Sequence, residues 1–507
     1  MQKKYAIKPL EQTYPQNNEI IMQKTKKEYQ NKIHQFFHPS DDLVEYILQL
    51  KTGKEAFLYY LEGLTDNAAL KNNVVLPLLE AKQVESVEDF PMVISVYMKK
   101  VHTWEEITSS ILEGQSVIFL EGISTGYVIQ TKGGTERGIE EPTSESIIRG
   151  AHDGFVESAA TNIGLIRGYL PSKELKVKKS TVGDRAKTSV YFLYLSDVAN
   201  KDILEEAEYL VGEIRIDTII HVGELARFMQ QDIWTPFPQF FTSERPDTIV
   251  KHILDGKIAI VLDHSPSVMI IPINLAGFFQ TADDYNISWS IASFLRFLRV
   301  TGFVLAVLLP AIYIAIVNYH FEIIPLDLYL SIAKSRVKVP FSPLVEALIM
   351  EFTIEMLREA GIRLPQPTGQ TIGIVGGIVV GQAAVQAGLV SNIMVIVVSI
   401  TAISSFIVPN YDLSSCIRLL RFPMMILAYL YGIVGIISGV MVLIAHLVTL
   451  KSFGVPYSLP LAPFIKKDWK DMLIRFPSSL LSKRSQVANP QQEVKKTTEM
   501  EKGDRDD

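Results

Sequence analysis

The sequence predicts a chain of two parts, an α/β soluble N-terminal region of two similar subdomains followed by an all-α multi-pass membrane domain. The main observation is that charge is segregated along the 507 residues. No Lys, Arg, Asp or Glu occurs in the 48 residues after Arg363, the 29 after Arg421 or the 22 after Arg299. A bilayer-spanning helix needs about 20 apolar residues, so these runs predict membrane spans. The first 295 residues contain no uncharged run that reaches 20 residues, but they carry an internal repeat.

The N-terminal arm, residues 1–35, is predicted to be basic and disordered. Up to Lys32 it carries seven lysines against three glutamates, and it has no apolar core of the kind a secretory signal needs. We therefore expect the N-terminal region to stay in the cytoplasm. The alternative to a flexible arm is a segment that contacts anionic lipids.

Two α/β subdomains, residues 36–135 and 171–290, are predicted from the internal repeat. Residues 111–122 recur at an offset of 142 residues, with five of the 12 positions identical. Each copy is typical of a helix that ends at a glycine, Gly114 or Gly256, and leads into a buried strand. Alternation of such helices and strands indicates α/β subdomains. The alternative is a chance likeness between two generic helix–glycine–strand units.

A helix over residues 136–170 is predicted to link the subdomains. Pro142 suits the first turn of a helix, and the acidic residues around it suit the positive end of the helix dipole. The simplest role of this helix is a scaffold, and a second polar segment at 242–247 would cap the helix that follows it. The alternative is that both segments contribute to a coupling surface. The candidates for this surface are Glu141, Glu145, Arg149, Arg167, Glu244, Arg245 and Asp247.

No pattern in the sequence predicts catalysis, and we expect no catalytic residue, metal ligand or cofactor. His34 and His38 have i,i+4 spacing but lack the glutamate of a zinc-protease motif. The single cysteine, Cys416, excludes an intrachain disulfide framework and a multi-cysteine metal site. The net charge of −6 argues against nucleic acid as a partner. The sequence thus favours a protein that is not an enzyme.

The membrane domain is predicted over residues 296–450, followed by a polar C-terminal tail, 451–507, that is disordered from about residue 482. The longest uncharged run would form a helix of about 72 Å, more than twice the ~30 Å hydrocarbon core, so it must fold back. Residues 343–361 carry four glutamates and apolar residues at i,i+4, which predicts an amphipathic surface helix. The four predicted spans cover residues 300–318, 371–388, 393–409 and 422–447.

The second predicted span carries small residues on one face and glutamines on another. Small residues spaced i,i+4 let a second helix approach closely. The stripe of small residues consists of Gly373, Gly377, Gly381, Ala384 and Gly388, and the glutamines are Gln382 and Gln386. One interpretation is tight packing, with the glutamines hydrogen-bonded to other helices. The alternative is that the glutamines line a hydrated pore in an oligomer.

The predicted orientation conflicts with part of the charge pattern. Four spans and a cytoplasmic N-terminus place the C-terminus inside, in agreement with the lysines that follow the last span. The five basic residues between Lys334 and Arg363 would then face outside, against the positive-inside rule. A short polar segment at 410–420, which contains Cys416, would join the third and fourth spans on the outer side.

Ordered blocks of residues across most of the chain resemble a known family. The blocks are Glu140-Glu141-Pro142, Thr161-Asn162, Leu165-Ile166-Arg167, Pro236-Phe237-Pro238-Gln239, Glu244-Arg245-Pro246-Asp247, Asp283-Asp284-Tyr285, Pro340-Phe341, residues 358–365 and Gly369-Gln370. On these blocks, residues 41–484 resemble the A subunit of a bacterial spore germinant receptor, of the GerA-type spore germination protein family.

The resemblance implies a complex in the inner membrane of dormant spores, with a transporter-like B subunit and a lipoprotein C subunit as partners. It implies that nutrients are sensed mainly through the B subunit, and that A subunits form a homo-oligomer that conducts or gates ion release. On this basis we expect a multi-pass protein surrounded by membrane lipids and acting in spore germination. The alternative class is a stand-alone multi-pass membrane transporter of small solutes or ions.

Overall fold

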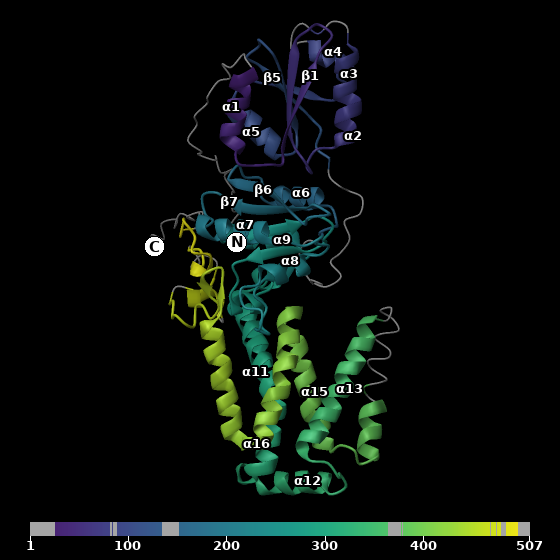
Figure 1. Cartoon of the computed structure of the whole chain (residues 1–507), viewed down its shortest axis with the longest axis vertical. Coiled ribbons are helices and arrows are strands. Elements are labelled where there is room, and N and C mark those ends of the chain that lie inside the picture. The colour runs from purple at the N-terminus through teal and green to yellow at the C-terminus, as the bar shows by residue number, and fades with distance from the viewer. Residues whose placement is uncertain are drawn as a thin grey trace, which may run out of the picture.

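The computed structural model divides into three parts along its longest axis (Figure 1). Subdomain 1 lies at one end, subdomain 2 in the middle and a helical region at the other end. The chain after the last long helix returns to lie beside subdomain 2. This architecture confirms the predicted fold class. The residues that the structure describes are 26–81, 84, 89–133, 152–363, 377, 379–466, 468–472, 474–477 and 483–494.

Subdomain 1 is a five-stranded antiparallel sheet with helices on both faces. The sheet order is β1-β2-β4-β5-β3. Because β2 and β4 lie inside the sheet and are covered on both faces, their sequences are nearly continuous apolar runs. Helices α1 and α5 cover one face, and α2 to α4 cover the other. The strands are β1 (Leu43–Gln49), β2 (Glu55–Leu61), β3 (Met98–Val101), β4 (Ser116–Leu120) and β5 (Gly126–Ile129). The helices are α1 (Lys26–Phe37), α2 (Asn67–Leu70), η1 (Lys71–Val75), α3 (Leu76–Glu80), α4 (Phe90–Val93) and α5 (Trp104–Leu112).

Helix α1 corrects the prediction of a disordered arm over residues 1–35, at least for its last part. Tyr29, Ile33 and Phe37 recur at i,i+4 and are buried against the sheet of subdomain 1. The basic composition of the arm obscured this apolar stripe, because lysines such as Lys27 and Lys32 lie close to its apolar residues in the sequence. Residues 1–25 lie outside the described part of the chain.

Subdomain 2 repeats the fold of subdomain 1, with the sheet order β6-β7-β9-β10-β8. Both sheets therefore place their first, second, fourth, fifth and third strands side by side, which confirms two similar subdomains. Helices α6 and α9 pack on one face, and α7 and α8 on the other. The strands are β6 (Leu175–Val182), β7 (Thr188–Leu195), β8 (Phe241–Ser243), β9 (Ile258–Leu262) and β10 (Val268–Ile271). The helices are α6 (Ala159–Tyr169), α7 (Lys201–Glu213), α8 (Val222–Met229) and α9 (Pro246–Leu254).

The repeated glycines mark the same turn in both subdomains. Gly114 has φ +88° and Gly256 has φ +90°, a backbone conformation that L side chains rarely adopt. Each glycine ends a helix, α5 or α9, and lets the chain enter the buried fourth strand of its sheet. The sequence repeat thus reflects a shared helix–turn–strand unit.

The linking helix is shorter than the predicted 136–170. Helix α6 begins at Ala159, and residues 152–158 are not helical. Ser158 caps α6 through the N–H of Thr161, and the Asn162 side chain exchanges two hydrogen bonds with the backbone of Val156, at 2.8 and 2.6 Å. These side-chain contacts stabilise a loop where the local pattern favoured helix. Residues 134–151 lie outside the described residues.

The described residues of the helical region form long and medium-length helices. Two of the described helices, α11 and α16, are long and apolar enough to cross a membrane, by length and composition. The helices are α11 (Trp289–Tyr319), α12 (Leu326–Arg336), α13 (Pro343–Arg363), α15 (Asn392–Ile407) and α16 (Tyr411–Thr449), and residues 379–386 are also helical. Short elements η3 (Leu275–Phe279), α10 (Asp283–Asn286) and η4 (Phe321–Ile323) flank them. The fourth helix in the chain order, at 371–388 in the prediction, is described only in part.

Helix α16 is a helical hairpin, so the prediction of one span over 422–447 is wrong. Gly432 has φ +61° and ψ −139°, and the chain reverses there (Figure 1). A Cβ built on Gly439 would lie 2.6 Å from the sulfur of Met424, although a straight helix would separate these residues by about 22 Å. The predicted polar connector at 410–420 is the first part of this hairpin, and Cys416 is buried.

Helix α13 corrects the prediction of an amphipathic surface helix at 343–361. Glu346 and Glu351 face inward and are buried, whereas Phe352 and Met356 are exposed. The polarity is inverted because the buried carboxylates find basic partners on other helices, for example Arg336 for Glu346 at 3.3 Å. A charge pattern along one helix could not reveal partners that lie elsewhere in the chain.

The C-terminal segment up to residue 494 corrects the prediction of a polar tail that is disordered from about residue 482, and residues 495–507 lie outside the described residues. Strands β11 (Lys451–Ser452) and β12 (Val455–Pro456) form a hairpin, and η5 (Asp468–Asp471) and η7 (Gln486–Ala488) follow. Phe453, Val455 and Val487 join the core of subdomain 2. The N–H of Gln491 donates to the carbonyl of Val198 at 2.8 Å. A few apolar residues among many polar ones are thus enough to dock this segment.

Candidate functional site

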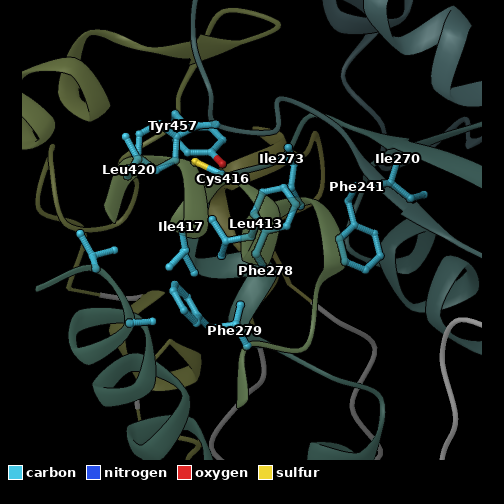
Figure 2. Close-up of a cluster of buried hydrophobic side chains, with 14 of the residues drawn as sticks. Phe241, Ile270, Ile273, Phe278, Phe279, Leu413, Cys416, Ile417, Leu420 and Tyr457 are labelled. Atoms are coloured by element: carbon cyan, nitrogen blue, oxygen red, sulfur yellow. The ribbon is translucent and has the colours of Figure 1, made fainter. Parts of the chain in front are cut away.

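Subdomain 2 and the helical region share one continuous buried core. Figure 2 shows this cluster between the subdomain 2 sheet and the first turns of α16. Ring centroids lie 6.0 Å apart for Phe241 and Phe278, and 6.3 Å apart for Phe278 and Tyr457. The side chains labelled in Figure 2 are Phe241, Ile270, Ile273, Phe278, Phe279, Leu413, Cys416, Ile417, Leu420 and Tyr457. Because close-packed interiors transmit strain, a displacement of the sheet would be felt by α16.

A buried ionic network joins the start of α11 to α10, the short helix before it. Asp284 has no exposed surface and accepts hydrogen bonds from Arg296 Nε at 2.9 Å and Arg299 Nη1 at 2.8 Å. Burial by itself would raise the pKa of Asp284, but the two guanidinium groups lower it below its usual value. The carboxylate therefore stays charged at neutral pH, and loss of its partners would leave a buried charge.

The C-terminal segment completes this network. Asp471 pairs with Arg296, with 2.9 Å between Nη1 and Oδ1, and accepts a hydrogen bond from the Tyr285 hydroxyl at 2.9 Å. The Arg475 guanidinium donates to the carbonyl of Asp284 and lies 4.6 Å from the centroid of the Tyr285 ring. Burial raises the pKa of Tyr285, so its hydroxyl remains a donor. The chain after α16 is thereby tied to the start of α11.

A second set of buried charges lies among the helices. Glu351 of α13 and Arg421 of α16 form an ion pair that is almost fully buried. Arg421 also donates to the carbonyl of Ala306 in α11 at 2.8 Å. Glu346 accepts a hydrogen bond from the backbone N–H of Ser391, at the start of α15, at 2.9 Å. Ionisable groups among apolar helices are costly and mark functional sites by default, so this set is a candidate for function.

The residues of the predicted coupling surface are distributed over several places. Glu141, Glu145 and Arg149 lie outside the described residues. Arg167 of α6 is buried and forms an ion pair with Asp42, just before β1 of subdomain 1. The close approach of Gly63 and Gly164 lies at the same boundary between α6 and subdomain 1. Arg167 is therefore part of the junction between the two subdomains.

The other three predicted coupling residues lie together at the start of α9. Arg245 is buried and pairs with Asp247, with 2.7 Å between Nη2 and Oδ2, while Glu244 precedes them. Close by, the Tyr169 hydroxyl of α6 donates to Asp153 at 3.0 Å. Burial, with Asp153 as the next cause, raises the pKa of Tyr169 to about 12. The apolar faces of α6 and α9 pack together, and the N–H of Phe155, in the loop before α6, donates to the carbonyl of Glu244 at 2.8 Å.

The stripe of small residues is only partly described. Gly373 lies outside the described residues, a Cβ on Gly377 would meet nothing within 4 Å, and a Cβ on Gly381 would touch Val395 at 3.9 Å. Gly388 does not continue the helix face, since it lies in a turn with φ +69°. Ala384 is half-buried.

The two glutamines lie on the described part of this helix, residues 379–386. Gln382 and Gln386 are both exposed in the single chain. An exposed amide among apolar residues has no hydrogen-bond partner in hydrocarbon and would need water or another subunit there. Their position is therefore suited to a hydrated or subunit-facing surface.

Comparison with known proteins identifies the family. The model of the Bacillus/Clostridium GerA spore germination protein family matches residues 31–487. The chain belongs to this family. It is 36% identical over 447 residues to a Bacillus subtilis (strain 168) protein named "Uncharacterized membrane protein YfkQ", covering 87% of each chain. It is 36% identical over 461 residues to "Spore germination protein B1" of the same organism, covering 90% of this chain and 95% of the relative.

A solved structure also matches the N-terminal part of this GerA-family chain. It is the N-terminal domain of the A subunit of the Bacillus megaterium spore germinant receptor GerK3. The match has 23% sequence identity and a TM-score of 0.39, and covers 49% of this chain and 94% of the other.

Sequence reasoning missed the buried charges of this GerA-family protein. Arg296 and Arg421 occur at the edges of apolar runs, and Asp284 occurs in the Asp283-Asp284-Tyr285 block, so nothing local indicates that they are buried. A charged residue at the end of an apolar run needs a partner or water, which is the one signal that the sequence offers. The partners themselves lie far away in sequence and cannot be identified from it. In the part of the chain that the structure describes, no group of three or more His, Cys, Asp or Glu could hold a metal ion.

Proposed function

We propose that this GerA-family chain is the A subunit of a nutrient germinant receptor in the spore membrane. Its membership of the family and its identity to a spore germination protein support a role in germination. The proposal includes a transporter-like B subunit and a lipoprotein C subunit as partners, and assigns no catalytic chemistry to this chain. The helical region crosses the membrane several times, and the N-terminal subdomains lie in the cytoplasm.

Exposed aromatic side chains at both ends of the long helices support this membrane placement. Trp289 begins α11, and Trp234 is 94% exposed. Trp234 is held near the end of α16, because its neighbour Thr235 bonds to His446, with 2.7 Å between Oγ1 and Nε2. At the opposite end of α11, Tyr319 is exposed. Aromatic belts at both interfaces are typical of membrane proteins, so the apolar helices between them match a bilayer.

The helical region forms or gates an ion-conducting oligomer in this proposal. The observation that carries this part is the exposed polar face of residues 379–386, where Gln382 and Gln386 have no cover in the single chain. Gly377 leaves open space on the same helix, which suits the close approach of a helix from another copy.

Movement of subdomain 2 reaches the helices through the shared core and the Asp284 network. Nutrient binding to a partner would displace subdomain 2, and the packed contact between Phe278 and α16 would pass this displacement on. The buried ionic network ties the first turns of α11 to the same unit. The soluble region and the helices then respond together.

The assembly part of the proposal is tested with Gly377→Leu. Since a side chain at Gly377 meets nothing within the chain, a loss of oligomer in crosslinking or native mass measurements would report contact with another copy. Gly361→Leu, also open within the chain, is the matched control and should assemble normally. Normal assembly of Gly377→Leu would contradict close packing at this helix.

The conduction part is tested with Gln382→Ala in liposomes. This change should leave assembly intact and alter ion flux, and unchanged flux would contradict a hydrated role for Gln382. In spores, deletion of the chain should abolish germination by one set of nutrients and leave germination by a non-nutrient chemical trigger intact. Substrate uptake by the chain alone in liposomes would favour a stand-alone transporter instead.

A further inference from the structure

A cavity of about 280 Å³ lies beside the Asp284 network, outside the apolar core. One wall is α9 and the start of β9, a second is the loop that leads to α11, and a third is the C-terminal segment. The cationic side chains that line it are Lys251, Lys257, Arg475 and Lys483. Three separate parts of the chain thus bring four positive groups to one cavity.

The side chains of the cavity lysines are in contact with no carboxylate among the described residues. Lys251 Nζ lies 2.9 Å from the centroid of the Tyr285 ring. In the part of the chain that the structure describes, the side chains of Lys251, Lys257 and Lys483 form no hydrogen bond or ion pair. Ammonium groups in such a setting attract an anion, since a buried charge is costly unless it is paired.

The carboxylates of the cavity are largely engaged elsewhere. Asp471 pairs with Arg296 and accepts from Tyr285. Asp468 accepts hydrogen bonds from Ser485 Oγ at 3.2 Å and from the N–H of Gln486 at 2.9 Å. The third carboxylate, Asp255, is near enough to favour the charged form of both buried lysines. Four cationic side chains therefore face three carboxylates among the described residues of the cavity.

The pKa values agree with this geometry. Burial lowers the pKa of Lys251 to about 7 and that of Lys257 to about 8. An anion bound in the cavity that both lysines line would favour their charged form and offset this cost. The lysines are thus poised to gain from a negatively charged ligand.

We propose that this cavity binds a phosphate group, carried by a small phosphorylated molecule or by the headgroup of an anionic phospholipid. A phosphate offers several acceptor oxygens, and lysine and arginine are its common protein partners. Bound phosphate would connect α9 to the C-terminal segment and hold that segment beside the start of α11. The site is independent of the pore and of the nutrient-sensing partner.

The test uses the full chain, purified in phosphate-free and lipid-depleted detergent. Inorganic phosphate is titrated by calorimetry into wild type, into the double variant Lys251→Gln with Lys257→Gln, and into Lys201→Gln. Lys201 is exposed on subdomain 2 and away from the cavity lining, so it serves as the matched control. We expect saturable binding to wild type and control, and a Kd weakened by about tenfold or more in the double variant.

A parallel arm separates the two sources of phosphate. The same proteins are placed in nanodiscs of phosphatidylglycerol or of phosphatidylcholine, and their thermal stabilities are compared. Stabilisation by phosphatidylglycerol that disappears in the double variant assigns the site to a lipid headgroup, and binding of free phosphate alone assigns it to a soluble ligand. Absence of both effects, or equal effects in wild type and the double variant, overturns the proposal.

Folding of the double variant provides an independent check. Without phosphate, we expect it to be at least as stable as wild type, because two buried cationic groups are removed. A purely structural role for the lysines predicts the opposite, a loss of stability in the absence of ligand.

Discussion

At the scale of single residues, buried charges dominate the energetics of this protein. Glu351 and Arg421 come from helices 70 positions apart in sequence and meet with almost no exposed surface. One oxygen of Glu351 and one nitrogen of Arg421 have no hydrogen-bond partner among the described residues. Such a pair is expensive to desolvate, and its partners depend strongly on each other.

Removal of one partner from this pair should lower the free energy of unfolding far more than replacement of both partners by apolar residues. We expect Glu351→Ala or Arg421→Ala to lower the free energy of unfolding by about 3–5 kcal/mol, because each leaves an uncompensated buried charge. The double change Glu351→Met with Arg421→Met should recover most of this loss. Denaturant unfolding of the detergent-solubilised protein measures the effect.

The exposed pair Glu359 and Arg363 on α13 is the matched control. Neutralising it should change the free energy of unfolding by no more than about 0.5 kcal/mol. If single and double changes at Glu351 and Arg421 were equally harmful, the two side chains would not be energetically coupled.

Lys251 predicts a particular dependence of stability on pH. In the unfolded chain its ammonium has a pKa of about 10.4. In the folded chain burial lowers this pKa to about 7, and the positive charge of Arg296 lowers it as well. The carboxylates of Asp471, Asp255 and Asp284 oppose this shift but do not cancel it. The folded protein therefore binds fewer protons between these values, and its free energy of unfolding should rise as the pH increases through this window.

In phosphate-free buffer, Lys251→Met should make the free energy of unfolding rise less steeply with pH. A smaller rise should remain, because Lys257 also has a lowered pKa. Thermal unfolding between about pH 7 and pH 10 measures the curves, with Lys201→Met as the exposed control. Parallel curves for wild type and Lys251→Met would mean that Lys251 does not titrate in this window.

At the scale of elements, the hairpin of α16 depends on glycines at and after its turn. A Cβ on Gly435 would collide with the carbonyl oxygen of Leu427, on the first arm of the hairpin. The Tyr319 hydroxyl of α11 donates to the carbonyl of Tyr429 at 2.7 Å, which fixes the position of the turn. The two arms thus pack backbone to backbone, as small residues allow in apolar surroundings.

Gly435→Ala should force the arms of α16 apart and destabilise the protein by about 1–3 kcal/mol, since the backbone of Leu427 cannot yield as a flexible side chain would. Gly361→Ala is the control, because that position is helical and open. It should be neutral or stabilising by up to about 1 kcal/mol through higher helix propensity. Melting temperatures of both variants give the comparison, and an unaffected Gly435→Ala would contradict the packed hairpin.

At the scale of the whole molecule, the path of the helices determines topology. The hairpin returns the chain to the end where α16 began, and the C-terminal segment docks on subdomain 2. Arg358 of α13 lies 4.7 Å from the ring of Phe406, near the end of α15. This basic residue therefore lies at the end of the helices nearer subdomain 2, whereas α12 lies at the far end (Figure 1).

Cysteine labelling can test this topology. Cys416 is buried and is replaced by serine, and single cysteines are placed at Leu328, exposed on α12, or at Lys201, exposed on subdomain 2. We expect a membrane-impermeant thiol reagent to label Leu328→Cys in intact cells and Lys201→Cys only after permeabilisation. The reverse pattern would invert the orientation, and equal labelling of both would contradict a bilayer between them.

The sequence by itself determined the two-part architecture, the internal repeat and the family. These features depend on local quantities, namely the length of uncharged runs, the spacing of apolar residues and the glycines at 114 and 256. A run of about 20 apolar residues is long enough to span a bilayer whatever its neighbours are, so it can be recognised from the sequence alone.

The tertiary structure alone decided the reversal of α16, the inward polarity of α13 and the docking of the C-terminal segment. Gly432 is one glycine among several in an apolar run, and its backbone conformation is fixed by packing against α11. Glu351 can be buried because Arg421 neutralises it, and Asp284 because Arg296 and Arg299 surround it. Long-range pairs of this kind offset the cost of burying a charge, and a pattern within one segment contains no information about them.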